Sequence, residues 1–297
     1  MRKKRLAFVL AVGFVLCMSH TGEAKPDIGQ ELFHLDRERF QFDFGTEVSR
    51  IRYAEPNLMK NKGYMYGVFG AVTYRTAGQE GITSWRDLFS GRSPLSLFRL
   101  EGKFSYGIVD YESEGTGTLD DIPDYMLEFR GLTGFDVFPV AALRLTPYIG
   151  LGYRYLNDDS GGKTTTTGHF GYERESNYFY LPVGLETFVK GKAGWGFGMT
   201  VEYDVFLDGE QKSHLGDAVT GLNTLKNDQN SGYGLRGSLK VMKETRKFNF
   251  YLEPFIRYWK IDDSEISPVT YSGVIVGYGR EPENNSTEYG VKLGLQF

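Results

Sequence analysis

Few residues of this chain have the types that catalysis usually requires. Of its four histidines, His20 and His34 lie near the start, and only His169 and His214 lie farther along, both in polar stretches. A lipid acyl hydrolase would need a serine or an asparagine beside a histidine at the membrane edge. His169 precedes Ser176, but a single histidine in a polar loop is more often solvated than catalytic. A hydrolase of this kind is not favoured.

The other candidates for acid–base chemistry are a pair of carboxylates and an aspartate–histidine pair. Asp110 and Glu112 share one face of a strand, because side chains alternate. Asp208 and His214 stand in a later polar stretch. We retain these four as catalytic candidates and assign a role to none, since solvated loop residues have the same pattern.

The sequence gives little support for a metal site or for a functional cysteine. Asp120, Asp121 and Asp124 could gather around calcium, but the segment lacks the regular oxygen spacing of a dedicated loop. Cys17 is the only cysteine, and it lies in an apolar leader. We therefore expect no metal and no cofactor.

The chain begins like an exported protein. Four basic residues at 2–5 precede an apolar run over 6–18, and Gly22 and Ala24 are small enough for a cleavage site. We expect residues 1–24 to be a signal peptide; a lipid anchor on Cys17 is disfavoured by the bulky Leu16 before it. Residues 25–39 have a helical apolar period and are expected to form a periplasmic arm, or else a disordered terminus.

Composition narrows the fold class. The net charge is −4 with both signs mixed along 297 residues, which excludes the basic face of a nucleic-acid binder. After the leader no run approaches the roughly 20 apolar residues of a membrane helix. With 22 Phe, 20 Tyr and 38 Gly, the chain is typical of strands that are apolar on one side.

Apolar and polar residues alternate in repeated segments from 40 to 297. In the last one, Tyr289, Val291 and Leu293 point one way while Glu288 and Lys292 point the other. The predicted strands are Phe40–Tyr53, Tyr64–Arg75, Phe98–Asp110, Tyr125–Val137, Leu145–Leu156, Asn177–Val189, Trp195–Leu207, Tyr233–Val241, Phe248–Lys260 and Ser286–Phe297. We therefore predict an all-β, closed, up-and-down antiparallel transmembrane barrel of about ten strands over 40–297.

The lengths of the connections between the predicted strands support the barrel, because outer-membrane barrels have short periplasmic turns and long outer loops. The predicted short turns are Phe138–Arg144, Gly191–Gly194 and Met242–Lys247, and the predicted outer loops are Ser113–Asp124, Asn157–Ser176, Asp208–Ser231 and Asp262–Asn285. Two connections break the rule: Pro56–Gly63 is short for an outer loop, and Thr76–Pro94, with a helical turn expected around Trp85–Phe89, is long for a periplasmic turn.

A soluble barrel would show the same alternation with its apolar face inside. The membrane barrel is favoured because aromatic residues cluster near strand ends, where the membrane interface would lie; these are Tyr64, Tyr66, Trp195, Tyr233, Tyr258 and Tyr289.

The polar face is expected to line the lumen with charges of both signs. Its predicted members are Asp43, Glu47, Arg99, Glu101, Lys103, Glu128, Arg130, Asp136, Arg154, Glu186, Glu202, Asp204, Arg236, Lys240, Glu253, Arg257, Glu288 and Lys292. In a barrel of about ten strands such charges can meet across the interior, and an unpaired one would be costly. We expect a salt-bridged core that closes the barrel; a narrow channel for small solutes is the alternative.

Two segments resemble known outer-membrane proteins. The closing run Tyr289-Gly-Val-Lys-Leu-Gly-Leu-Gln-Phe297 resembles the C-terminal strand that the barrel-assembly machinery recognises, which would make Phe297 an assembly signal. The run Leu145-Thr-Pro-Tyr-Ile-Gly-Leu-Gly-Tyr-Arg-Tyr155 looks like strands of small opacity-protein and OmpA-type barrels. The resemblance implies architecture and carries no catalytic residue.

The strand count and chain length also resemble the omptin proteases, whose family uses a carboxylate pair opposite an Asp–His pair. Asp110 and Glu112 would supply the first pair, but Asp208 and His214 are too far apart for the family's tight Asp-x-His step. We therefore expect a non-enzymatic surface protein of the outer membrane, structural or adhesive, with a narrow channel as the first alternative and an omptin-like protease as the second. Its partners would be lipids and lipopolysaccharide, the assembly machinery and an unidentified outer ligand, and no nucleic acid.

Overall fold

The computed structural model describes residues 40–76, 95–140 and 142–297. The predicted signal peptide over 1–24, the arm over 25–39 and the helical turn around Trp85–Phe89 lie outside these residues.

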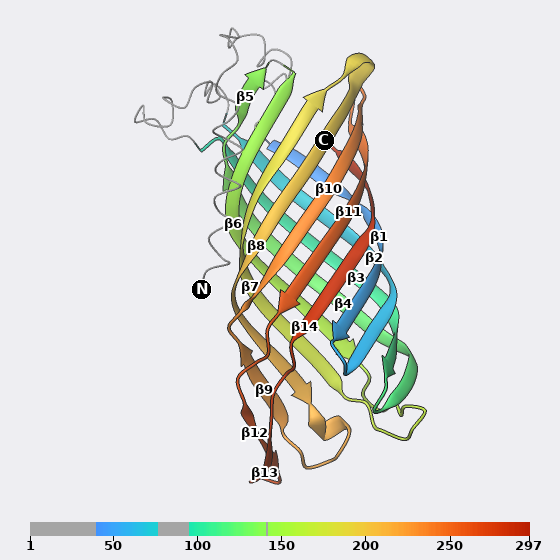
Figure 1. The fold of residues 1–297 in the computed structure, drawn as a ribbon. Helices are drawn as coiled ribbons and strands as arrows, with labels where there is room; N and C mark the ends of the chain where they lie inside the picture. Colours follow the sequence, from blue (N-terminus) through green and yellow to red (C-terminus); the bar gives the residue numbers. More distant parts are fainter. Residues whose placement is uncertain (1–39, 77–94, 141) are drawn as a thin grey trace.

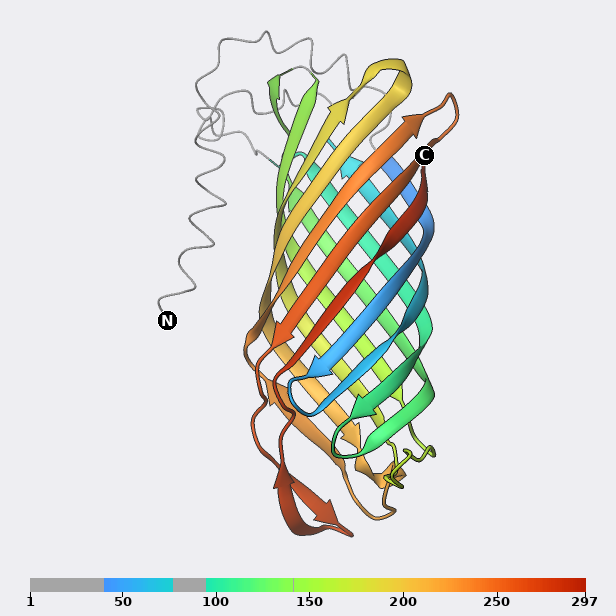
Figure 2. The ribbon, with the colours of Figure 1, turned by 45° about the vertical axis from the view of Figure 1, so that its right-hand side comes forward.

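Ten antiparallel strands form a closed barrel, as predicted (Figures 1 and 2). They are β1 (Phe40–Glu55), β2 (Met59–Arg75), β3 (Leu97–Ser113), β4 (Gly117–Gly134), β6 (Leu143–Asp159), β7 (Glu173–Lys190), β8 (Trp195–His214), β10 (Gly232–Glu244), β11 (Asn249–Ile261) and β14 (Asn284–Gln296). The first and last strands close the sheet, since β1 pairs with both β2 and β14. Phe297 continues this seam, because its backbone N–H and C=O both bond to Phe42.

Shorter elements occupy the ends of the barrel. β5 (Val137–Val140) and the 3-10 turn η2 (Lys192–Gly194) lie at the end that holds the C-terminus, while η3 (Leu215–Asp217), β9 (Thr224–Gln229), β12 (Ser267–Tyr271) and β13 (Val274–Gly279) extend the opposite end (Figure 1). By the rule of short inner turns and long outer loops, the end with β9, β12 and β13 is the outer one.

An apolar belt surrounds the outside of the barrel, because the outward side chains of each strand are apolar over one stretch and polar beyond it. On β1 the belt runs from Phe40 to Val48 and gives way to Arg50. On β8 it runs from Trp195 to Leu207 and gives way to Glu210. Such stretches of roughly ten tilted residues match the 25 Å apolar band of outer-membrane barrels.

No helix among the described residues is long and apolar enough to cross a membrane.

The strands continue well past the outer edge of the belt, and here the predicted loops were wrong. Ser113–Asp124 is mostly strand, because β3 ends at Ser113 and β4 begins at Gly117. Pro56–Gly63 shrinks to a turn before β2 begins at Met59, and Asp208–Ser231 contains the end of β8 and all of β9. Beyond the lipid both strand faces are polar, so alternation disappears although the backbone ladder continues.

Inward glycines receive aromatic rings from neighbouring strands and so allow large side chains into a narrow lumen. A Cβ on Gly152 would lie 2.1 Å from Cζ of Tyr180, and one on Gly184 would lie 2.3 Å from Cζ of Tyr148. This packing accounts for Gly152 in the run over 145–155, whereas Gly150 in the same run lies close to the backbone of β4 at Gly131 and Leu132.

Replacing Gly152 with alanine should lower the free energy of unfolding by about 1–3 kcal/mol, the usual cost of overpacking. The ring of Tyr180 cannot easily move aside, because its hydroxyl donates to Glu128 at 2.7 Å and accepts from Arg236 at 3.0 Å. The measurement is urea unfolding in lipid vesicles. Gly131→Ala is the matched control, since its Cβ would meet only Leu100 at 3.7 Å. Equal losses in both variants would show that the ring contact is not the cause.

Candidate functional site: the barrel lumen

A cluster of buried ion pairs lies in the middle of the lumen. The guanidinium of Arg257 donates to Glu47 at 2.9 and 3.1 Å and to Glu288 at 3.0 Å. Nζ of Lys103 lies 3.3 Å from Glu47 and 3.5 Å from Glu288. The hydroxyls of Ser49 and Ser105 donate to the same carboxylates. Side chains from β1, β3, β11 and β14 thus form one neutral cluster of two acids and two bases.

A second cluster lies against the opposite wall. Nε of Arg236 donates to Asp204 at 2.6 Å, and its Nη1 donates to Glu128 at 3.0 Å. Glu202 joins the cluster through Nε of Arg236 at 3.1 Å, and it also accepts from Arg130 and from the Tyr148 hydroxyl, the latter at 2.6 Å. The two clusters tie most strands of the barrel together across its interior.

The lumen residues chosen from the sequence all lie on inward faces, and nearly all of them lie in ion pairs. Arg99 pairs with Glu186 at 2.8 Å and with Glu101 at 3.6 Å. Glu253 lies between Lys240 and Lys292, at 3.2 and 3.5 Å. Arg154 differs: its partners are the Ser286 hydroxyl at 3.5 Å and the ring of Trp259. Sequence reasoning missed Arg75, which pairs with Asp136, and Arg144, 3.9 Å from Glu186.

A cavity of about 300 Å³ occupies the inner half of the lumen. Glu47, Lys103, Glu128, Arg236 and Arg257 line its deep end, and Gln41, Arg75, Lys190, Asn249 and Gln296 line it nearer the inner rim. The cavity is therefore a polar, inner-facing vestibule that ends at the two ion-pair clusters.

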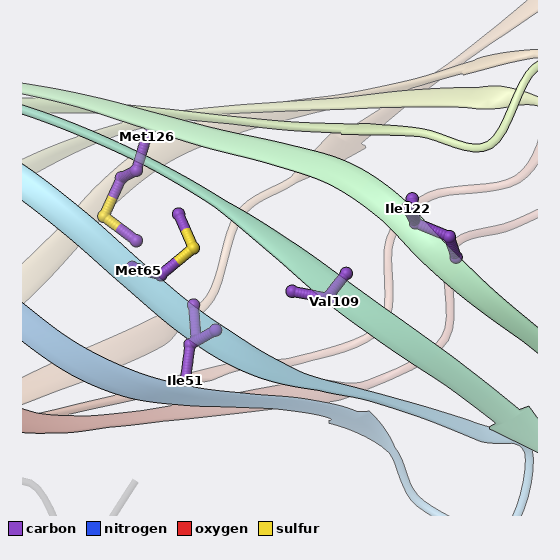
Figure 3. Packing of buried hydrophobic residues seen from close by; sticks show 5 residues of the cluster. All are labelled: Ile51, Met65, Val109, Ile122 and Met126. Carbon is purple, nitrogen blue, oxygen red and sulfur yellow. The ribbon is translucent and has the colours of Figure 1, made fainter.

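Apolar side chains fill the lumen beyond those clusters, which the prediction of a charge-filled interior did not anticipate. One cluster consists of Ile51, Met65, Val109, Ile122 and Met126, all at most 2% exposed (Figure 3). Another consists of Tyr178, Tyr180, Phe206, Trp259 and Ile261. A third, Phe188, Met242 and Tyr251, lies toward the inner end and lines the vestibule. The signal was available in the sequence, because Val109 has the same parity as Lys103 and Ser105 on β3.

Buried polar side chains adjoin the apolar clusters toward the outer end of the lumen, and Asp124 lies between Ile122 and Met126 on β4. Asp124 and Asp158 face each other on paired strands, and Asn61 donates to Asp158. Arg174 joins Glu55 at 2.7 Å to Glu281 at 2.9 Å.

The four catalytic candidates do not form one site. Asp110 and Glu112 point outward from β3, where Glu112 pairs with Lys60 at 2.6 Å. His214 points outward from β8 and contacts Glu175 at 2.7 Å, while Asp208 is exposed on the same strand. Three strands, β4, β6 and β7, separate the two groups in the sheet.

The carboxylate of Glu175 shows how exposed this outer cluster is. Its slight burial favours the neutral form, but hydrogen bonds from His214 and from Tyr155 outweigh this and hold the pKa of Glu175 below its usual value. The arrangement is a hydrogen-bonded His214–Glu175 contact on the outer wall, three strands or more from Asp110 and Glu112 in the sheet.

The other loop candidates are also dispersed. His169 is exposed and bonds to Thr167 at 3.0 Å. Asp120 and Asp121 are exposed, whereas Asp124 is buried in the lumen. Within the described ranges no group of three or more histidine, cysteine, aspartate or glutamate residues could hold a metal ion.

Solved structures that resemble this chain are outer-membrane barrels. The outer-membrane protease OmpT from Escherichia coli has a TM-score of 0.59 at 12% identity, over 94% of this chain and 99% of that one. The translocator domain of autotransporter NalP from Neisseria meningitidis has a TM-score of 0.42 at 10% identity, over 90% and 91% of the two chains. No protein-family model and no curated protein matches the sequence. At such low identity the OmpT likeness establishes the barrel fold and not a chemistry.

Proposed function

We propose that this chain is a non-conducting surface protein of the outer membrane, whose closed barrel holds rigid β-hairpins outside the cell for binding. The observation that carries the proposal is the filled outer half of the lumen. Two ion-pair clusters on opposite walls close the inner vestibule, and apolar clusters follow them toward the outer end. A continuous water path would have to displace side chains that pack across the barrel.

The outer wall supports the same placement in a membrane. Arg50, Lys60 and Lys62 line a groove beside Tyr64 and Tyr106, at the outer edge of the belt. Four carboxylates line the same groove, Asp110, Glu112, Asp120 and Asp121, and Glu112 lies 2.6 Å from Lys60 and 3.7 Å from Lys62. The guanidinium of Arg50 lies 5.9 Å from the centre of the Tyr64 ring. A guanidinium at this height suits a phosphate group of lipopolysaccharide, which we propose as the lipid partner.

The C-terminal strand supports export to this membrane. Tyr289, Val291, Leu293, Leu295 and Phe297 all point outward and are exposed. We propose that the barrel-assembly machinery recognises this row before the seam with β1 closes.

Single-channel recording tests the proposal. The refolded protein, inserted into a planar bilayer, is expected to show no steady conductance steps, because the ion pairs and apolar side chains interrupt the water column. Insertion is verified from the heat-modifiable band on a gel, and a known porin in the same bilayer serves as the positive control. Reproducible steps of one size would instead support the narrow-channel alternative.

A further inference from the structure

Two neighbouring turns at the inner end of the barrel are strongly basic. They are the β7–β8 turn and the β10–β11 turn, at the end that holds the C-terminus (Figure 2). They are neighbours because β8 pairs with β10, which places Trp195 opposite Lys243. Together the two turns contain one acidic residue, Glu244, and five basic residues, which are Lys190, Lys192, Lys243, Arg246 and Lys247. We call these two turns the basic rim.

Contacts within and between the turns hold the basic rim in place. The N–H of Gly191 donates to the C=O of Trp195 at 2.8 Å and closes the β7–β8 turn. Nζ of Lys190 lies 3.0 Å from Glu244 on β10. Nζ of Lys243 donates to a backbone carbonyl of the β7–β8 turn. The cations are therefore presented from a fixed part of the barrel wall.

Most of the positive charge on the basic rim is not balanced by a carboxylate. The side chain of Glu244 is engaged by Lys190. In the part of the chain that the structure describes, no ion pair joins the other four basic residues to a carboxylate, the C-terminal one of Phe297 included. Three of the four are exposed and Lys243 is half-buried. A negatively charged partner would thus meet these cations without first displacing an acidic side chain.

The basic rim lies at the inner edge of the apolar belt. Trp195 begins the belt on β8 and is 44% exposed. Phe248 and Phe297 lie on the same rim, with their ring centres 6.2 Å apart. Nζ of Lys243 lies 5.1 Å from the centre of the Trp195 ring. Because exposed aromatic rings settle at the boundary between hydrocarbon and headgroups, the cations lie at the height of lipid phosphates.

We propose that the basic rim binds the phosphate headgroup of an anionic phospholipid in the inner leaflet of the membrane. Ammonium and guanidinium groups form charge-assisted hydrogen bonds with phosphate oxygens. The acyl chains of the same lipid lie against the belt below Trp195, so one molecule satisfies both the charged and the apolar part of the surface. A zwitterionic lipid fits less well, because its own ammonium group would meet the same cations. This site is independent of whether the lumen conducts.

The test is quenching of tryptophan fluorescence by brominated lipids in the full-length chain, refolded into phosphatidylcholine vesicles that contain phosphatidylglycerol. All samples have Trp85→Phe, so that Trp195 and the buried Trp259 are the tryptophans that remain. Brominated phosphatidylglycerol is expected to quench more than the same amount of brominated phosphatidylcholine. The preference should be at least about fivefold, since each cation near an anionic surface contributes roughly this factor. It should also decrease as salt is added.

The triple variant Lys192→Gln, Arg246→Gln and Lys247→Gln should reduce this preference towards one. The matched control is Lys163→Gln, Lys226→Gln and Arg280→Gln, which removes the same charge from the outer end of the molecule and should retain the preference. The heat-modifiable band verifies that both variants are folded.

Three outcomes would overturn the inference. The first is equal quenching of the starting protein by the two brominated lipids. The second is the same preference in both triple variants, which would make it an effect of net charge or of other surfaces. The third is an unchanged lipid preference in the rim variant together with lost binding of polyglutamate, which would identify an acidic polypeptide as the partner. The conductance assay tests the closed lumen separately, so the two proposals can fail independently.

Discussion

Replacing Arg257 with methionine is expected to lower the free energy of unfolding by about 3–5 kcal/mol, the cost of removing one partner from a buried ion pair. Arg257 donates to both Glu47 and Glu288, which are 2% and 3% exposed. Without the guanidinium, Lys103 alone would face two carboxylates at distances of 3.3 and 3.5 Å. The excess negative charge would be held on two buried carboxylates, which water reaches only from the deep end of the vestibule.

The measurement is urea unfolding in lipid vesicles followed by tryptophan fluorescence. Lys260→Met is the matched control, because the Lys260–Glu283 pair at 3.0 Å is exposed at the outer end of β11, and such pairs contribute at most about 1 kcal/mol. The double variant Glu47→Gln with Arg257→Met should regain part of the loss, since it removes one of the stranded charges. Similar losses for Arg257→Met and Lys260→Met would contradict the assignment of a buried cluster.

Placing arginine at Leu151 should cost about 2–4 kcal/mol, the usual penalty for a cation on the lipid face near the bilayer midplane. Leu151 is 66% exposed and lies near the centre of the belt on β6. In water an exposed leucine tolerates such a change with little effect, so the penalty reports the lipid environment itself.

Refolding into vesicles tests this, with the heat-modifiable fraction and the urea midpoint as readouts. Leu58→Arg is the control, because Leu58 is exposed in the β1–β2 turn beyond the belt, and it should change stability by no more than about 0.5 kcal/mol. If the belt lies in lipid, arginine at position 151 lowers the stability and arginine at position 58 does not. Equal tolerance of arginine at both would mean that the apolar belt is not embedded.

The fold class could be predicted from alternation because the bilayer acts on every outward residue in the same way. The outward Leu293 faces the apolar surroundings of the barrel, whereas the inward Lys292 faces the polar lumen. Apolar and polar residues therefore alternate in the sequence with a period of two. The inward residues that form the ion pairs could be predicted from the same alternation. The ends of the strands could not be predicted, because residues such as Lys60 and Asn61 on β2 lie beyond the lipid, where both faces of a strand tolerate polar side chains.

Composition and periodicity alone thus specify a closed antiparallel barrel, its lipid face and its charged inward face. Only the tertiary structure decides which residues meet across the lumen, because Glu47 and Arg257 come together through the closure of β1 on β14 and the register of β11. The tertiary structure also shows that Asp110 and His214 lie apart on the outer wall. The linear sequence could not show this, because the directions of outward side chains on non-adjacent strands depend on how the sheet closes. The exposure of Val274, Ile275 and Val276 on β13 has the same origin, because strand pairing is a non-local choice and a run of valine and isoleucine does not reveal whether a neighbour will cover it.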